Sequence, residues 1–338
     1  MTNFINDLPV SFQIISFLFI LVIGAVFLIK CCDIFLDSAC VIARKFKIPK
    51  VIIGLTIVAI GTSIPELSVS LSDAFSSAVS GSNSNIGFSN VVGSNISNLL
   101  LVLSFGCMFT PIIIKKQNKK DYGIMLFVTF VLLAFVLWFG NGNEILRWEA
   151  IVLSIFIIFY IVYIVLGVKN ESAENDCVEE KEENVLKHVL YIVLCIMGIA
   201  VGGKMVVYGA EGIALNISNL LNVEKDMAET LVGLTIVGVG TSLPELVTTL
   251  MSSKKGENEI ALGNVIGSNI FNIIFVIGLS GSIAPFTISS YMIFDLVVLV
   301  FATLFVMFFV FKGKLDKKHS FLFLFLYLVY IIYLIVRI

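Results

Sequence analysis

Charged residues are scarce in this chain of 338 residues. Lys, Arg, Asp and Glu make up 14% of it, whereas a soluble domain contains about 25%. There are only two histidines, and the six cysteines show no metal-binding spacing. These shortages argue against a nucleic-acid partner and a resident metal or other cofactor. No catalytic motif or nucleotide-binding loop is present either, so we expect no enzyme activity and no catalytic residue.

Apolar residues are abundant, at 58% of the chain, and the mean hydropathy is +1.03. A helix needs about 20 mostly apolar residues to cross a bilayer. Because the apolar runs are continuous rather than alternating, they predict helices and exclude a barrel. We therefore expect an all-α integral membrane protein, in contact with the lipid bilayer, with ten transmembrane helices at residues 11–41, 51–77, 87–110, 121–140, 147–168, 187–217, 229–252, 260–284, 288–311 and 319–337.

The distribution of charge predicts the orientation. Residues 1–13 contain no Lys or Arg, unlike the positive start of a cleaved signal peptide, so we expect the first helix to be retained. Basic residues cluster after the odd-numbered helices, which places those loops inside by the positive-inside rule. We expect a multi-pass protein of the cell membrane with both termini outside. The clusters are Arg44, Lys45, Lys47 and Lys50, then Lys115, Lys116, Lys119 and Lys120, then Lys169 and Lys181, then Lys254 and Lys255, then Lys312, Lys314, Lys317 and Lys318.

The chain contains an internal repeat. Residues 54–67 recur at 233–246 with eleven of fourteen positions identical, and residues 90–98 are echoed by 264–272. Five predicted crossings separate the copies, an odd number, so the halves should be inverted five-helix repeats, as in many secondary transporters. We expect the repeats at 1–168 and 187–338. The acidic segment 169–186 between them lacks an EF-hand pattern and reads as a solvated cytoplasmic linker.

Each repeat places a glutamate in an apolar stretch, where a carboxylate marks an ion pathway by default. Pro65 lacks an N–H, which frees the Gly61 carbonyl and should break the helix ahead of Glu66. Broken backbone at this depth is tolerated where it lines a wet cavity. Its carbonyls, with neighbouring hydroxyls, are hard oxygen ligands that suit Ca²⁺ or Na⁺. The second copy has the same elements in Gly240, Thr241, Ser242, Pro244 and Glu245.

The second block adds neutral oxygens. Ser94 and Asn98 are four residues apart, on one helical face, as are Ser268 and Asn272. Asn95 and Asn269 point elsewhere on the helix and are candidates for hydrogen bonds between helices. Two carboxylates match one Ca²⁺ or several monovalent cations, and they would repel an anion.

The doubled pattern Gly-Thr-Ser-x-Pro-Glu and Asn-Val-x-Gly-Ser-Asn resembles the two alpha-repeats of the sodium/calcium exchanger family, prokaryotic type, within the cation/calcium antiporter superfamily. The resemblance implies an antiporter that moves Ca²⁺ out against a Na⁺ gradient by alternating access. It assigns Ca²⁺ to the carboxylates of Glu66 and Glu245 and the carbonyls of Thr62 and Thr241. It assigns Na⁺ to the same two glutamates together with Ala59, Ser63, Ser94, Gly238, Ser242 and Ser268, supported by Asn98 and Asn272.

Three departures from the family pattern stand out. Asn occupies both position 98 and position 272, where members often have one Asp, which puts K⁺ dependence and stoichiometry in doubt. Ser89 replaces a glycine that the second repeat keeps as Gly263. Residues 80–85 lengthen the loop between the two blocks of the first repeat. Lys204 and Asp33 also lie within predicted helices, and their pairing is left open.

Other functions remain possible from the residues alone. A H⁺/Ca²⁺ antiporter, or another exchanger of monovalent for divalent cations, would use the same glutamates because carboxylates also carry protons. Inverted repeats with a narrow central ion site argue against a passive cation channel. The lack of a nucleophile and base argues against an intramembrane enzyme. A monomer in the bilayer suffices for the exchanger interpretation.

Overall fold

Helices account for nearly all of the computed structural model, which describes residues 9–46, 48–80, 86–139, 144–170, 184–220 and 240–336. The α-helices are α2 (Val10–Lys45), α3 (Lys50–Ile53), α4 (Ala59–Thr62), α5 (Ile64–Ser80), α6 (Ile86–Ser97), α7 (Leu103–Phe109), α8 (Lys116–Ala134), α9 (Arg147–Asn170), α10 (Val185–Leu220), α13 (Leu243–Lys254), α14 (Asn258–Phe271), α15 (Gly278–Ile283), α16 (Ser290–Lys312) and α17 (Lys317–Val336). In the described part of the chain, π-helical segments accompany them at η1 (Gly54–Val58), η2 (Asn98–Val102), η3 (Phe135–Phe139) and η5 (Asn272–Ile277).

The expected membrane-spanning architecture is confirmed, but the count of ten is not. In the described part of the chain, eight helices are long and apolar enough to span a bilayer, or nine if the bent pair Lys50–Thr62 and Ile64–Ser80 forms one span. The first part of the expected span at 229–252, up to residue 239, lies outside the described residues, and α13 represents most of the remainder. Most of the linker 169–186 also lies outside them.

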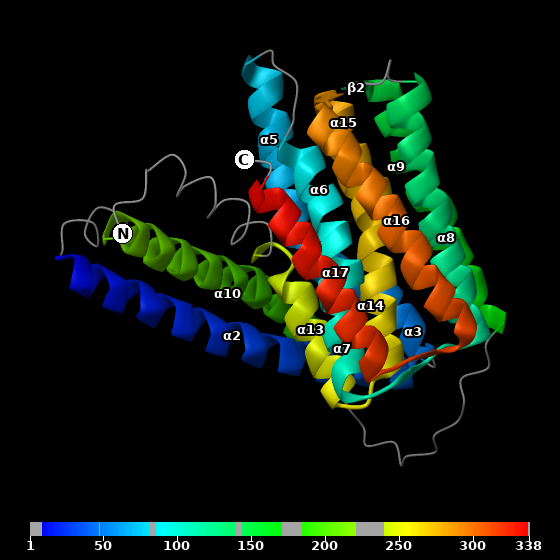
Figure 1. Cartoon of the computed structure of the whole chain (residues 1–338). Coiled ribbons are helices and arrows are strands. Elements are labelled where there is room, and N and C mark those ends of the chain that lie inside the picture. The colour runs from blue at the N-terminus through cyan, green and yellow to red at the C-terminus, as the bar shows by residue number, and fades with distance from the viewer. Residues whose placement is uncertain are drawn as a thin grey trace.

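Two helices of 36 residues each, α2 and α10, run side by side along one flank of the molecule (Figure 1). Glycines let their backbones approach closely. A Cβ added to Gly202 would lie 2.9 Å from the backbone nitrogen of Leu28, and one on Gly209 would lie 2.7 Å from the carbonyl oxygen of Phe17. Close approach at small residues is how helices associate in a membrane, where van der Waals packing replaces the hydrophobic effect.

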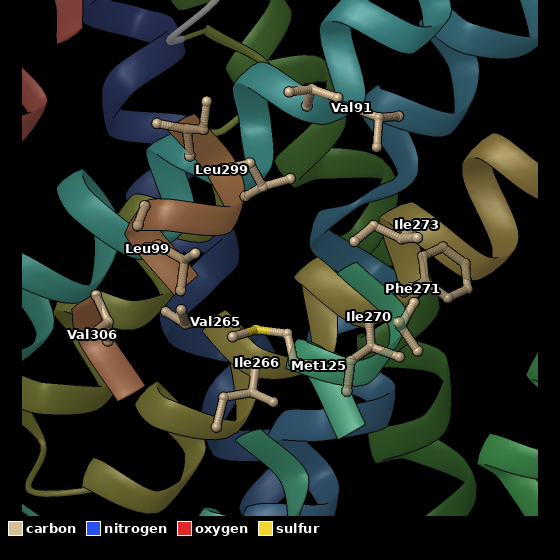
Figure 2. Packing of buried hydrophobic residues seen from close by; sticks show 14 of the residues in the cluster. Val91, Leu99, Met125, Val265, Ile266, Ile270, Phe271, Ile273, Leu299 and Val306 are labelled. Carbon is tan, nitrogen blue, oxygen red and sulfur yellow. The ribbon is translucent and has the colours of Figure 1, made fainter. Parts of the chain in front are cut away.

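The remaining helices form a bundle with a central and a peripheral layer (Figure 1). At the centre, 94% of the apolar window of Asn258–Ile283 and 83% of that of Ile86–Phe109 are buried, against 28% in Arg147–Leu166. Figure 2 shows side chains of the core between them, with Leu99, Val265 and Ile270 drawn among residues from other helices. The central helices carry the repeated second block, so the core holds that block in place.

Two short ribbons relate the halves of the chain. β1 (Ile112–Ile113) pairs antiparallel with β4 (Lys314–Leu315), and β2 (Glu144–Ile145) pairs with β3 (Phe286–Thr287). In the predicted repeats β1 corresponds to β3, and β2 to β4, because each follows the equivalent helix. Each ribbon therefore joins one half to the other, and the two ribbons exchange under the repeat symmetry. This pairing agrees with the predicted inverted repeats.

Candidate ion-binding site

Both repeated motifs begin a new helix one residue ahead of their proline. Ser63 ends α4 with φ −84° and ψ 8°, and the pieces on either side are bent by 46°. Ser242, ahead of α13, has nearly the same backbone, with φ −83° and ψ 3°. Pro65 and Pro244 are the second residues of α5 and α13, where the missing N–H costs no helical hydrogen bond. The motif therefore starts a new helix at the same point in each repeat.

Each break places a glutamate in the first turn of the helix that follows. Glu66 lies there in α5 and Glu245 in α13, and both side chains are fully buried. The unpaired N–H groups of a helix start favour a negative charge. Among the described residues neither carboxylate forms a salt bridge. Two buried carboxylates without a cationic partner are costly, so a bound cation would stabilise this arrangement.

The two carboxylates differ in their hydrogen bonds. Ser63 Oγ donates to Glu245 Oε1 at 3.1 Å. Within the described residues, Glu245 Oε2 and both carboxylate oxygens of Glu66 have no hydrogen-bond partner, and neither has the buried Ser242 Oγ. Unpartnered oxygens at the centre of a membrane protein are what a desolvated cation requires as ligands.

Hydroxyl groups from both repeats surround the carboxylates. The pairs that adjoin each one are Ser94 and Thr241 beside Glu66, and Thr62 and Ser268 beside Glu245. The two hydroxyl oxygens of the first pair are 3.3 Å apart, and those of the second 3.5 Å. Each carboxylate is therefore flanked by one hydroxyl from each half of the chain, so the site lies at the interface of the repeats.

Two asparagines to which the sequence analysis assigned no role bind the backbone next to each helix start. Asn90 Nδ2 donates to the Glu66 carbonyl at 3.4 Å, and Thr241 Oγ1 donates to Asn90 Oδ1 at 3.3 Å. Asn264 does the same in the other half, with 3.4 Å to the Glu245 carbonyl and 3.2 Å from Thr62 Oγ1. The signal was available in the sequence, because both asparagines open the repeated second block.

Four buried amides join the central helices. Asn95 and Asn269 each donate to the other's carbonyl, at 3.2 and 3.3 Å. Asn98 Nδ2 donates to Asn269 Oδ1 at 3.1 Å, and Asn272 Nδ2 donates to Asn95 Oδ1 at 3.0 Å. The predicted hydrogen bonds between helices are thus present. They leave Asn98 Oδ1 and Asn272 Oδ1 without a hydrogen-bond partner among the described residues.

Both of those amides begin a π-helical segment, η2 at Asn98 and η5 at Asn272. Single π turns inside α-helices are frequent at functional sites, since they redirect side chains and carbonyls. The Ala59 carbonyl accepts a hydrogen bond of 3.5 Å from Ser268 Oγ, the hydroxyl beside Glu245. Gly238, its predicted counterpart, lies outside the described residues.

Of the predicted side chains, those placed beside the two carboxylates are Thr62, Ser63, Ser94, Thr241 and Ser268. Lys204 and Asp33 do not pair: Asp33 Oδ1 forms a salt bridge of 2.6 Å with Lys255, which also contacts Asp37. In the described part of the chain, no group of three or more His, Cys, Asp or Glu side chains could hold a metal ion. The oxygen-rich, two-carboxylate arrangement suits hard cations instead.

Comparison with known proteins agrees with this chemistry. The sequence model of a family described as sodium/calcium exchanger protein matches residues 16–168 and 187–336. The chain is similar to the sodium/calcium exchanger MaX1 of Methanosarcina acetivorans, with 33% identity over 311 residues that cover 81% of this chain and 85% of the relative. It is also similar to the inner membrane protein YrbG of Escherichia coli, with 31% identity over 300 residues, covering 84% and 87%.

The fold has a counterpart among solved structures. The sodium-calcium exchanger NCX_Mj, soaked with Na⁺ and Sr²⁺, superposes with a TM-score of 0.75 and 30% sequence identity. The match covers 94% of this chain and 98% of that structure. The likeness therefore extends over both predicted halves.

Proposed function

The chain belongs to the sodium/calcium exchanger family, and from this premise we propose that it exchanges Na⁺ for Ca²⁺ across the cell membrane by alternating access, exporting Ca²⁺. The observation that carries the proposal is the pair of fully buried carboxylates, Glu66 and Glu245, which start two helices at matching breaks. Three of their four oxygens have no hydrogen-bond partner among the described residues. One Ca²⁺ would neutralise both charges.

The proposed ligands are those that the family resemblance assigns. Ca²⁺ is held by the two glutamates and by the carbonyls of Thr62 and Thr241, since it prefers six to eight oxygen ligands. Na⁺ ions take the same carboxylates with hydroxyl and carbonyl oxygens around them, which are Ser63, Ser94, Ser242 and Ser268 and the carbonyls of Ala59 and Gly238. Asn98 and Asn272 support the site with their unpartnered amide oxygens. Both ions therefore compete for the same carboxylates.

Exchange further requires two states and a driving force. We propose that 1–168 and 187–338 are inverted repeats joined by the linker 169–186, so that exchanging their conformations opens the site to opposite sides. Both termini lie outside in this proposal. Each Na⁺ that enters with the membrane potential supplies about 2.3 kcal/mol per 100 mV. Several Na⁺ ions can therefore drive one Ca²⁺ outward.

A proton-coupled Ca²⁺ antiporter is the second candidate, favoured by one observation. The glutamates are the only carboxylates in the described site, since positions 98 and 272 are amides. Protons would then have to bind the same two side chains as Ca²⁺. Na⁺ coupling has the broader support, because hydroxyl and amide oxygens surround the pair and these bind Na⁺ but not protons.

The test is ⁴⁵Ca²⁺ uptake into proteoliposomes loaded with Na⁺, with K⁺, or with a pH gradient and no Na⁺. We expect uptake that requires internal Na⁺. Uptake driven by the pH gradient alone would overturn Na⁺ coupling and support the second candidate. Glu259→Gln is a matched control, because it removes a carboxylate that pairs with Lys115 away from the site. It should leave exchange unchanged.

A further inference from the structure

A pocket of about 440 Å³ lies between α5 and α10 and takes no part in the site described above. Its lining consists of the polar side chains Ser68, Ser72, Asp73 and Ser76 from α5 and Lys204 from α10, together with the apolar Val69 and Ile86. Asp73 is seven residues beyond Glu66, which places it on the same helical face about 10 Å farther along α5. Asp73 therefore places one wall of the pocket on the face of α5 that carries the carboxylate, toward the end of that helix.

The opposite end of the molecule is held together by ion pairs. Lys255, after α13, contacts Asp33 and Asp37 of α2. Lys50, at the start of α3, pairs with Glu257 at 2.9 Å. These contacts tie the long flanking helix and the broken helix to the turn between α13 and α14. The pocket beside α5 is lined by none of these ion-paired residues.

The serines make the pocket wall a set of acceptors. Ser68 Oγ donates to the Ile64 carbonyl and Ser72 Oγ donates to the Ser68 carbonyl, each at 2.8 Å. With its proton committed to the helix, each hydroxyl turns its lone pairs outward. Asp73 adds a carboxylate, whose Oδ2 accepts from Gly87 N at 2.9 Å. Such a wall attracts cations.

Lys204 on the facing helix is the exception in this lining. It is exposed, and within the described residues it forms no salt bridge. An ammonium group on a flexible four-carbon stem is a compact point charge with three donors. It lines the same pocket as the acceptors that an entering cation would use, and its positive charge would repel that cation.

We propose that Lys204 sets the apparent affinity for cations entering through the α5–α10 pocket, acting as a tethered competitor for the oxygens of Ser68, Ser72 and Asp73. The inference rests on the proposed function, in that the entering ions are Ca²⁺ and Na⁺. Coulomb energy scales with the charge of the ion. Removing the lysine charge should therefore lower the half-saturating concentrations of both ions. The factor for Ca²⁺ should be the square of the factor for Na⁺.

The transport test compares Lys204→Gln with the wild type at low ionic strength, with each ion varied on one side of the proteoliposome at a time. We expect half-saturating Ca²⁺ to fall about tenfold and half-saturating Na⁺ about threefold on the pocket side alone, as expected for one charge about 6 Å away in water. Lys204→Arg should match the wild type, and Asp73→Asn should raise both values. Equal shifts on both sides, equal factors for both ions, or no shift would overturn the proposal.

Lys30→Gln is the matched control, because Lys30 is an exposed lysine within α2 that does not line the pocket. It should change neither half-saturation. Added choline chloride should shrink the Lys204→Gln effect, since about 1 M salt shortens the screening length to about 3 Å. An effect that persists at high salt would indicate a packing role and contradict the charge mechanism.

A second readout does not depend on ion exchange. Ser72→Cys places a thiol on the pocket wall, and its modification by a cationic and by a neutral methanethiosulfonate reagent can be timed, with the wild type as blank. Adding Lys204→Gln should speed the cationic reagent about threefold and leave the neutral one unchanged. If that holds while Na⁺-dependent Ca²⁺ flux is absent, the proposed function fails and the role of Lys204 stands. Equal acceleration of both reagents would overturn the role of Lys204.

Discussion

In the Glu245 half of the site, Ser63 holds one carboxylate oxygen by a hydrogen bond of 3.1 Å, whereas in the Glu66 half the corresponding Ser242 hydroxyl and both carboxylate oxygens have no partner among the described residues. The surrounding bonds are otherwise alike, with Asn90 and Asn264 bonded in the same way to the carbonyls of the two glutamates. The same motif thus produces one carboxylate that accepts a hydrogen bond from its serine and one that does not.

A second difference concerns how closely the helices cross. A Cβ on Gly263 would lie 2.7 Å from the Val51 carbonyl and 3.0 Å from the Gly54 Cα, so α14 and the broken helix meet backbone to backbone. Ser89, at the matching position of the first repeat, is exposed in α6. The departure from glycine is tolerated where the side chain has room. The two repeats therefore share a site but not a packing.

The carboxylates should show the largest effects and the strongest test of their equivalence. Glu66→Gln or Glu245→Gln leaves one charge to face a divalent cation. Loss of one partner from a buried charged contact costs about 2–5 kcal/mol, so Ca²⁺ affinity should fall about 30-fold or more in either variant. The measurement is equilibrium ⁴⁵Ca²⁺ binding to purified protein, with gel filtration to verify folding. Near wild-type binding in one variant would show that only the other glutamate forms the site.

The helix crossing should give the next largest contrast, in stability rather than binding. Gly263→Ala forces a methyl group against the Val51 carbonyl, and overpacking of this kind costs about 1–3 kcal/mol. Ser89→Ala, at an exposed position, should stay within about 0.5 kcal/mol. Thermal unfolding of the two variants in detergent measures both. Equal melting temperatures would mean that α14 can move away from the broken helix at little cost.

The serine pair tests the asymmetry directly. Ser63→Ala removes the donor to Glu245 Oε1, and a hydrogen bond to a charged group is worth about 1.5–3 kcal/mol. We expect Ca²⁺/Ca²⁺ exchange, assayed without Na⁺, to need about tenfold more Ca²⁺ in this variant. Ser242→Ala removes no hydrogen bond seen among the described residues. It should raise the Ca²⁺ concentration needed for exchange by less than about threefold. The opposite order would assign the held carboxylate to Glu66.

The sequence predicted the parts of this site that depend on local chemistry. Proline removes a donor and a buried glutamate needs a cation, so the breaks before Glu66 and Glu245 and the apolar spans followed from residue type and spacing alone. The partner of Asp33 could not be predicted in this way, because Lys255 is 222 residues away and no local pattern links the two residues. The difference between Ser63 and Ser242 was also hidden, since identical motifs differ only in the conformation they adopt.

The amides should show the smallest difference between the halves. Asn98 and Asn272 each donate to an amide oxygen of the opposite repeat, at 3.1 and 3.0 Å. In Asn98→Asp or Asn272→Asp only the protonated carboxyl group can still donate, whereas the ionised form faces an acceptor with a third charge at the site. Each variant should therefore transport Ca²⁺ like the wild type at low pH and diverge from it as the pH rises. The measurement is the ratio of variant to wild-type Ca²⁺ flux as a function of pH. Because the two hydrogen bonds match, the two profiles should agree within about half a pH unit. Clearly separated profiles would show that the asymmetry at the serines extends to the amides.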